Sequence, residues 1–346
     1  MNLTRRDFLS TGSKALGLGL AAKAGVGLRL PRPEVRSLAA GQALHTVTFQ
    51  LGWIANVENM GPYVAQDLGY YTKQGLNVNI IPGGPSTTTE PLVVSGRAFT
   101  ALDTVDTIAR ARLQGAPLKV VAVTLQNNPS GVMSLAKKPI RSPKGLVGKR
   151  LGIQTSAIAE YNAFLEMNGV NPKSVTYVPV EYDPAPLVDG QVDAFVSFQT
   201  SEPIELKLQG VDTFTFLLSQ FGYNLWSDAY FVTQSTLNNS AARSNLVHLL
   251  RASIKGWQTA CQEPDFAAKL VVDKYGKSLG LGLKSQELTA KAFVSLVETP
   301  STKKSGLLNM SEDGIESNLR TMRTEGIKIS ASELFDRSII AEALLY

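Results

Sequence analysis

A loop carrying an indole, an amide and a carboxylate follows the first predicted strand. Trp53, Asn56 and Glu58 stand directly after the predicted strand 46–51. An indole face stacks on a flat ring, an amide donates and accepts, and a carboxylate accepts from N–H or O–H groups. The structural alternatives are core packing of the tryptophan, a turn stabilised by the asparagine, and a solvated glutamate. These residue types favour non-covalent binding of a flat, polar molecule.

A glycine-rich turn, GGPS from residue 83, lies between the predicted strand 77–82 and the predicted helix 86–96. Glycine lets backbone approach a ligand closely, and free N–H groups at a helix start bind polar groups. Gly84 and Ser86 are therefore candidate contacts, although Ser86 can equally cap the helix. The turn lacks the Gly-Lys-Ser/Thr of a Walker loop, so it does not predict a nucleotide phosphate site.

Polar side chains also follow four later predicted strands. These candidates are Asp103 after 98–102, Gln154 and Thr155 after 150–153, Tyr182 after 175–180, and Gln199 and Ser201 after 192–198. Ligands of open α/β sheets bind outside the carboxyl ends of strands, so these side chains are expected to face one site. Asp103 and Glu202 can instead stabilise the starts of the helices that follow them.

A second aromatic cluster follows residue 220. Tyr223 and Trp226 stand there with Asp228 and Tyr230. One interpretation is packing at a crossing between two parts of the fold. The other is that Trp226 or Tyr223 covers the ligand face opposite Trp53, which completes an aromatic sandwich.

Residues suited to covalent or metal chemistry are scarce. The chain has two histidines, His45 and His248, and one cysteine, Cys261. A single cysteine precludes an intramolecular disulfide and a Cys-rich metal site, and it most simply packs as a small apolar side chain. Neither a nucleophile elbow nor a zinc-ligand spacing occurs. We therefore expect no catalytic residue, no metal, no cofactor and no enzyme activity.

Strands alternate with helices over the first two thirds of the chain. The predicted strands are 46–51, 77–82, 98–102, 119–125, 131–136, 150–153, 175–180 and 192–198, and the predicted helices between them are 62–74, 86–96, 104–114, 157–168 and 202–210. Beyond residue 230 the pattern becomes helical, at 239–262, 265–275, 286–297 and 312–324. This alternation predicts an α/β fold with largely parallel sheets.

The N-terminus has the features of an export signal. Arg5 and Arg6 belong to a twin-arginine pattern, an apolar Gly/Ala-rich run follows, and residues 37–39 offer a cleavage site. We assign residues 1–39 to this signal, which holds seven of the 34 Lys and Arg and two of the 29 Asp and Glu. The remainder has 27 of each, so the net charge gives no support to a nucleic-acid or anionic-membrane partner.

Three segments together carry a family resemblance. They are LGWIANVENMGPYVAQDLGYYTKQGLNVNIIPGG at 51–84, SPKGLVGKRLGIQTSA at 142–157 and GQVDAFVSFQTSEPIELKLQG at 190–210. Their order and spacing resemble the solute-binding proteins of the NMT1/THI5-like (SsuA-type) group, which serve ABC importers. The resemblance covers residues 46–275.

The resemblance implies a periplasmic-binding-protein-like (type II) fold of two lobes with a cleft between them. Lobe 1 is expected at 40–130 plus 230–346 and lobe 2 at 131–229, with crossings near 128–131 and 221–229. Such a protein closes around its ligand by a hinge motion. It works as an exported monomer with an ABC permease and ATPase, and it meets the membrane only through that permease. A periplasmic sensory partner shares the same fold and stays an alternative.

The resemblance also narrows the ligand to a planar heteroaromatic vitamin or precursor. The N-V-E-x-x-G and P-G-G-P forms look like the riboflavin-binding branch, which favours riboflavin. A thiamine pyrimidine ranks second, because that branch tends to carry a histidine where Met60 stands. Sulfonate would call for a basic group that the loops lack. Pyrimidine synthases of the family carry a Cys-rich motif and are not exported, so an enzyme is the remote alternative.

Overall fold

The computed structural model describes residues 43–345, which belong to one compact unit, Ala40–Tyr346. The predicted export signal at 1–39 lies outside the described residues. None of the described helices combines the length and the apolar character that crossing a membrane requires.

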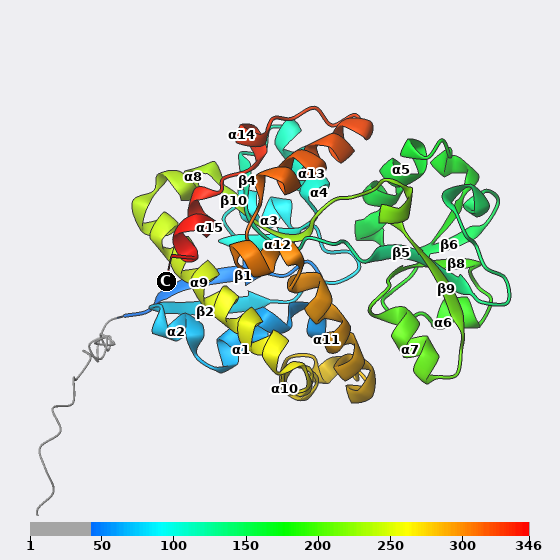
Figure 1. Ribbon diagram of the computed structural model, residues 1–346, viewed down its shortest axis with the longest axis horizontal. Coiled ribbons are helices and arrows are strands. Elements are labelled where there is room, and N and C mark those ends of the chain that lie inside the picture. The colour runs from blue at the N-terminus through cyan, green and yellow to red at the C-terminus, as the bar shows by residue number, and fades with distance from the viewer. Residues whose placement is uncertain (1–42, 346) are drawn as a thin grey trace, which may run out of the picture. The chain divides into compact units, whose positions relative to one another are not determined.

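The first sheet has five strands in the order β2-β1-β3-β10-β4 (Figure 1). Their bounds are β1 His45–Gln50, β2 Leu76–Ile81, β3 Thr100–Asp103, β4 Leu118–Leu125 and β10 Ser227–Thr233. β1 runs parallel to β2 and β3, whereas β10 is antiparallel to β3 and β4. Every residue of β4 is buried, although β4 is the last strand in the order. The C-terminal segment covers it, since Asp336 N–H donates to Val120 O at 2.8 Å, which protects an otherwise open edge.

The second sheet has the order β7-β6-β8-β5-β9. Its strands are β5 Ser130–Leu135, β6 Arg150–Ile153, β7 Thr176–Pro179, β8 Ala194–Phe198 and β9 Thr213–Leu217. β6 is parallel to β7 and β8, and β5 is antiparallel to β8 and β9. The helices α5 Ile158–Met167, α6 Ala185–Val188 and α7 Glu202–Leu208 accompany this sheet (Figure 1).

The remaining helices accompany the first sheet (Figure 1). They are α1 Met60–Asp67, α2 Tyr70–Lys73, α3 Glu90–Val94, α4 Val105–Leu113, α8 Gln234–Asn238, α9 Ser240–Gln262, α10 Pro264–Leu270, α11 Leu283–Val297, α12 Pro300–Ser305, α13 Glu312–Thr324, α14 Ala331–Leu334 and α15 Ser338–Ala343. Two glycines let α1 and α9 cross closely, because a Cβ on Gly256 would lie 2.2 Å from Gly61 O. Trp257 is fully packed at the same crossing.

The α/β class is confirmed, but two strands were not predicted. The sequence pattern predicts a crossing followed by helices where β10 lies, and it assigns no element to β9. β10 is an interior strand of the first sheet, and residues 229–232 are buried in succession, so the strand shows no alternation. A short apolar run of this kind cannot be assigned by periodicity.

Several element bounds also differ from the prediction. The helix predicted over 86–96 is only Glu90–Val94, because Pro91 is tolerated in the first turn of a helix and not beyond it. The helix predicted over 265–275 becomes a π turn from Val271 onward. The chain leaves the first sheet between β4 and β5 and returns between β9 and β10, so residues 227–229 of the second predicted crossing belong to β10. The lobe boundaries at 130 and 230 stay predictions.

Candidate ligand-binding site

A cavity of about 560 Å³ collects residues from the loops after strands of both sheets. Those from the first sheet and its helices are Gly52, Trp53, Glu58, Thr87, Thr88, Glu90, Leu102, Asp103, Thr104, Thr107, Ser227 and Asp228. Those from the second sheet and its helices are Ser130, residues 154–162, residues 196–198, Ser201 and Glu202. The volume suits a small organic ligand.

Trp53 reaches the cavity through a tightly packed turn after β1. A Cβ on Gly83 would lie 2.5 Å from Leu51 O, so only glycine fits there, and Gly83 N–H donates to Trp53 O at 2.8 Å. Asn56 is buried and its Oδ1 accepts from Glu58 N–H at 3.1 Å. Asn56 therefore holds the turn that presents Glu58, and it does not line the cavity itself.

Asp103 and Glu90 form an acidic pair at the end of β3. Thr89 Oγ1 donates to Asp103 Oδ2 at 2.7 Å, and Thr104 N–H donates to Oδ1 at 2.8 Å. Glu90 opens α3, is 5 % exposed, and has no hydrogen-bond partner for its Oε1. Both carboxylate oxygens of Asp103 therefore accept hydrogen bonds within the fold, whereas Glu90 Oε1 is a buried acceptor without a partner.

Asp228 lies near the start of β10 in an unusual backbone conformation. Its φ of 50° is in the left-handed region that most residues avoid. Its Oδ2 is buried without a hydrogen-bond partner, although the residue lines the cavity. Strained residues of this kind cluster at functional sites.

The second sheet contributes a further set of polar side chains. Gln154 donates through Nε2 to Glu181 O at 3.3 Å, and Glu202 Oε2 accepts from Phe198 N–H at 2.9 Å. Glu160 in the first turn of α5 is 8 % exposed, and its Oε1 has no partner. Ser156 N–H donates to Pro85 O at 2.9 Å, which joins the loops after β6 and β2 beside the cavity.

Burial is the largest cause of a raised pKa in each of six carboxyls lining the cavity. It raises the pKa of Asp103 to about 6, of Glu202 and Asp228 to about 7, and of Glu90 to about 8. The pKa values of Glu58 and Glu160 are also well above their usual range. Neighbouring carboxylates add to the effect, since Asp103 faces Glu90 and Asp228.

Within the described part of the chain, the cavity lining contains no Lys, Arg or His. Its acids are not arranged as a metal site either, because residues 43–345 hold no group of three or more His, Cys, Asp or Glu that could bind an ion. The geometry therefore offers an indole face and several acceptors to an organic ligand.

The family model described as NMT1/THI5 like matches residues 56–267, which is more than half of the chain. The chain belongs to the NMT1/THI5-like family. This confirms the resemblance of the three sequence segments.

Two curated members of the family match over most of the chain. The formylaminopyrimidine-binding protein of Halalkalibacterium halodurans is 27% identical over 245 residues, covering 69% of this chain and 73% of the relative. The riboflavin-binding protein RibY of Chloroflexus aurantiacus is 26% identical over 239 residues, covering 67% of each.

An enzyme and a solved structure are more distant matches. The 4-amino-5-hydroxymethyl-2-methylpyrimidine phosphate synthase of Schizosaccharomyces pombe is 25% identical over 164 residues, 46% of this chain and about half of its own length (47%). The alkanesulfonate-binding protein SsuA of Xanthomonas axonopodis pv. citri, bound to MOPS, aligns with a TM-score of 0.61 and 15% identity. That alignment covers 86% of this chain and 100% of the other, which confirms the periplasmic-binding-protein-like fold.

The fold of this NMT1/THI5-like chain brings together six of the predicted contact residues. Trp53, Glu58, Asp103, Gln154, Thr155 and Ser201 line the cavity. Outside the lining are Asn56, Gly84, Ser86, Tyr182, Gln199, Tyr223 and Trp226. Gly83, and not Gly84, is the glycine that a close backbone approach requires, since only Ile54 comes within 4 Å of a Cβ on Gly84. The role of each lining residue in binding stays a prediction.

Tyr223 and Trp226 are packed in the core and do not face Trp53 across the cavity. Trp226 is 4 % exposed, its ring meets Phe335 edge-on at 6.2 Å, and a Cβ on Gly314 would lie 2.1 Å from Trp226 Cζ2. Tyr223 is fully buried and donates to Asp106 Oδ2 at 3.2 Å. This arrangement favours the packing interpretation and provides no aromatic sandwich.

Four cavity acids are absent from the predicted contacts: Glu90, Glu160, Glu202 and Asp228. Glu90 and Glu160 each stand in the first turn of a helix, where an acid ordinarily complements the positive helix end. Asp228 belonged to the second aromatic cluster, but its unusual φ could not be foreseen from sequence. For Glu90 and Glu202 the available signal is an acid directly after Thr89 or Ser201 at a strand-to-helix turn.

Proposed function

We propose that this protein is the extracytoplasmic solute-binding component of an ABC importer and binds a planar heteroaromatic vitamin or vitamin precursor. Family membership supports this proposal, as do two relatives that are a formylaminopyrimidine-binding protein and a riboflavin-binding protein. Riboflavin and a thiamine-type aminopyrimidine are the two candidate ligands, and the relatives support them equally.

The single observation that carries the proposal is the composition of the cavity. Trp53 offers an indole face for ring stacking, worth about 0.5–1.5 kcal/mol beyond the buried area. Gln154, Glu58 and Asp103 surround it with groups that accept hydrogen bonds from ring N–H or hydroxyl groups. A ring with polar edges matches this lining in both shape and hydrogen bonding.

The same lining argues for binding over catalysis. Burial raises the pKa of Cys261 to about 12, so this thiol on α9 is a poor nucleophile. His248 lies on the same helix and outside the cavity lining. An enzyme of the pyrimidine synthase class is therefore the less favoured function.

Export and hinge closure complete the proposal. The twin-arginine pattern at residues 5–6 would direct the chain to the cell envelope, with the signal at 1–39. Closure of the predicted lobes, 40–130 plus 230–346 and 131–229, would follow only if the ligand binds the closed form better. A permease and an ATPase would then take over the ligand.

The proposal is tested by titrating the purified protein with riboflavin and with 4-amino-5-hydroxymethyl-2-methylpyrimidine, following tryptophan fluorescence and heat. We expect saturable binding of one of them with a Kd near or below about 1 µM. Turnover of the pyrimidine, or saturable binding of neither compound, would contradict the proposal.

A further inference from the structure

We propose that the cavity binds its heteroaromatic ligand as a cation, with the positive charge on a ring nitrogen. The inference rests on the proposed function and narrows it, because riboflavin is uncharged. It is carried by the acidic residues of the cavity, by their unused buried acceptors, and by the position of Trp53.

The described cavity lining is acidic. Glu58, Glu90, Asp103, Glu160, Glu202 and Asp228 line one cavity, and its described lining includes no basic side chain. Arg110 on α4 is already paired with Asp106 and Glu325 and is not part of the lining. A cation would favour ionisation of these acids, whose pKa values burial raises, whereas an anion would oppose it.

Three buried carboxyl oxygens in the cavity have no hydrogen-bond partner, an observation that does not depend on counting charges. Glu90 and Glu160 are 5 % and 8 % exposed, and each keeps one oxygen without a hydrogen-bond partner while lining the cavity. Asp228 does the same through Oδ2. A buried acceptor left unpaired costs about 1–3 kcal/mol, so these oxygens point to a ligand that supplies donors. A protonated heteroaromatic amine supplies both donors and charge.

Trp53 supplies an aromatic face to the same cavity. Trp53 is partly exposed and belongs to the same lining as the six acids. An indole attracts a cation placed over its ring, by about 0.5–2 kcal/mol depending on desolvation. A tryptophan beside carboxylates is suited to a flat cation, because stacking and charge act on the same ring.

Proton linkage follows from this arrangement. Cation binding lowers the pKa of the facing carboxyls, so protons leave the protein, and a permanent cation must bind more tightly as pH rises from about 6 to 8. The six acids that line the cavity lie on η1 (Val57–Asn59), α3, β3, α5, α7 and β10. Other titratable groups face the cavity or lie directly behind it, namely Asp106, Glu205, Glu325, Tyr63 and Tyr161.

The experiment compares compounds that differ in charge, using calorimetry on the purified full chain. Thiamine carries a permanent ring cation, thiochrome is its neutral fused derivative, 4-amino-5-hydroxymethyl-2-methylpyrimidine can be protonated on its ring, and riboflavin is neutral. We expect thiamine or the protonated pyrimidine to bind at least about tenfold more tightly than either neutral compound. Thiamine binding should release protons, which buffers of different ionisation heat measure, whereas the pyrimidine takes up a proton on its ring and offsets that release.

Matched variants assign the effect to the cavity acids. Asp228→Asn keeps the backbone conformation, since asparagine tolerates a positive φ, and Glu160→Gln keeps the shape of its side chain. Each is expected to weaken the cation at least about tenfold, because one buried negative charge is removed. Glu166→Gln on α5 is the control, because Glu166 is exposed and outside the lining.

The outcomes separate this inference from the proposed function. Tighter binding of riboflavin or thiochrome, or equal effects of Glu160→Gln and Glu166→Gln, would overturn the cation inference and leave a solute-binding protein for neutral rings. Binding of none of the four compounds would overturn the inference and the proposed function together.

Discussion

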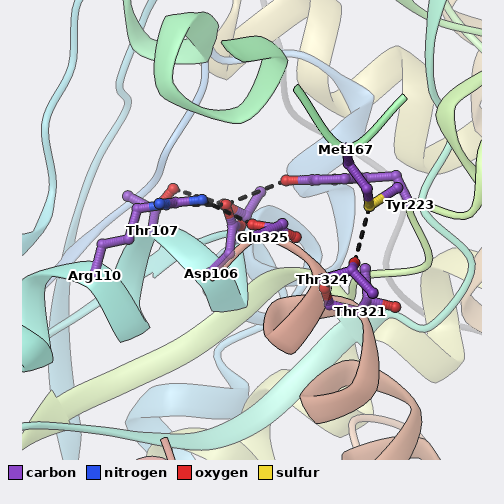
Figure 2. A network of polar contacts seen from close by, with 9 residues as sticks. Asp106, Thr107, Arg110, Met167, Tyr223, Thr321, Thr324 and Glu325 are labelled. Carbon is purple, nitrogen blue, oxygen red and sulfur yellow. Dashed lines mark hydrogen bonds and ion pairs between the residues drawn. The ribbon is translucent and has the colours of Figure 1, made fainter. Parts of the chain in front are cut away.

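Buried carboxyls occur in two regions of this molecule with opposite surroundings. In the network that joins α4, the end of α13 and the crossing before β10, Asp106 and Glu325 share one cation (Figure 2). Arg110 Nη2 lies 2.8 Å from Glu325 Oε2, and Tyr223 donates to Asp106 Oδ2. Around the cavity, six acids have no such cation among the described lining residues. Carboxyl groups stabilise the fold in the network, whereas the carboxyl groups of the cavity are proposed to bind the ligand.

The network also connects helices of the two sheets. Thr324 Oγ1, on α13, donates to Met167 Sδ of α5 at 3.0 Å (Figure 2). Burial and the neighbouring Asp106 raise the pKa of Glu325 to about 8, while Arg110 opposes that rise. The network thus contains a cation beside its buried acids, whereas the described cavity lining contains none.

Removing the shared cation should have the largest effect. Arg110→Ala leaves the buried carboxyls of Asp106 and Glu325 without a cation, so we expect the free energy of unfolding to fall by about 2–4 kcal/mol. Urea unfolding of the ligand-free protein measures this change. Arg320→Ala is the control, because its pair with Glu316 is exposed and is worth about 0–1 kcal/mol. Equal losses in the two variants would remove the contrast between network and surface.

Truncating the cavity indole should act on binding and not on stability. Trp53→Ala is expected to weaken the ligand at least about tenfold, because a stacking surface is lost, while the thermal midpoint changes little. Trp226→Ala should do the reverse, since its ring fills the core against Phe335. Titration and thermal unfolding of both variants check this pair of expectations. Unfolding of Trp53→Ala with intact affinity in its folded fraction would assign Trp53 to the core.

Neutralising a cavity acid should cost the ligand-free protein nothing. Asp228→Asn removes a buried carboxyl that has no cation, so the free energy of unfolding should stay constant or rise by up to about 1 kcal/mol. The equivalent change Asp106→Asn should lower it, since Arg110 loses a counter-charge and the Tyr223 hydroxyl loses a charged acceptor. If both variants lose stability equally, the cavity acids are structural after all.

The smallest expected effect is a slope in stability with pH. Burial raises the folded-state pKa of Asp103, Glu202, Asp228 and Glu90 to values between about 6 and 8. The folded protein therefore binds more protons, and stability present below the unfolded pKa values is lost as pH rises through this range. Thermal midpoints of the free protein should fall from about pH 5 to 8. Glu90→Gln should flatten the curve, and Glu166→Gln should not.

Local sequence predicted the parts of the site that local backbone determines. The loop after β1 could be foreseen because Trp53 and Glu58 follow a strand end directly, and parallel strands bring such ends together. Gln154, Thr155 and Ser201 follow the same rule on the second sheet.

Long-range placement could not be predicted in the same way. The start of β10 lies beside the end of β3 at the cavity edge, because β10 is antiparallel to β3. Trp226 precedes this start, yet its ring packs against Phe335 in the core, a contact that is remote in sequence. Asp228 reaches the cavity only through a left-handed backbone conformation, which no local propensity of aspartate specifies. Glu160 Oε1 has no hydrogen-bond partner, which depends on residues remote in sequence, and a single segment carries no information on them.

The position of β10 also determines the order in which the molecule can fold. β10 lies between β3 and β4 in the first sheet, yet the chain reaches it only after every strand of the second sheet. During synthesis the edges of β3 and β4 that pair with β10 therefore stay open until β10 emerges. Closure of the first sheet is then slow, because it depends on contacts that are remote in sequence. Asp228 arrives with that last strand, so the cavity acquires its full set of acids only when the sheet closes.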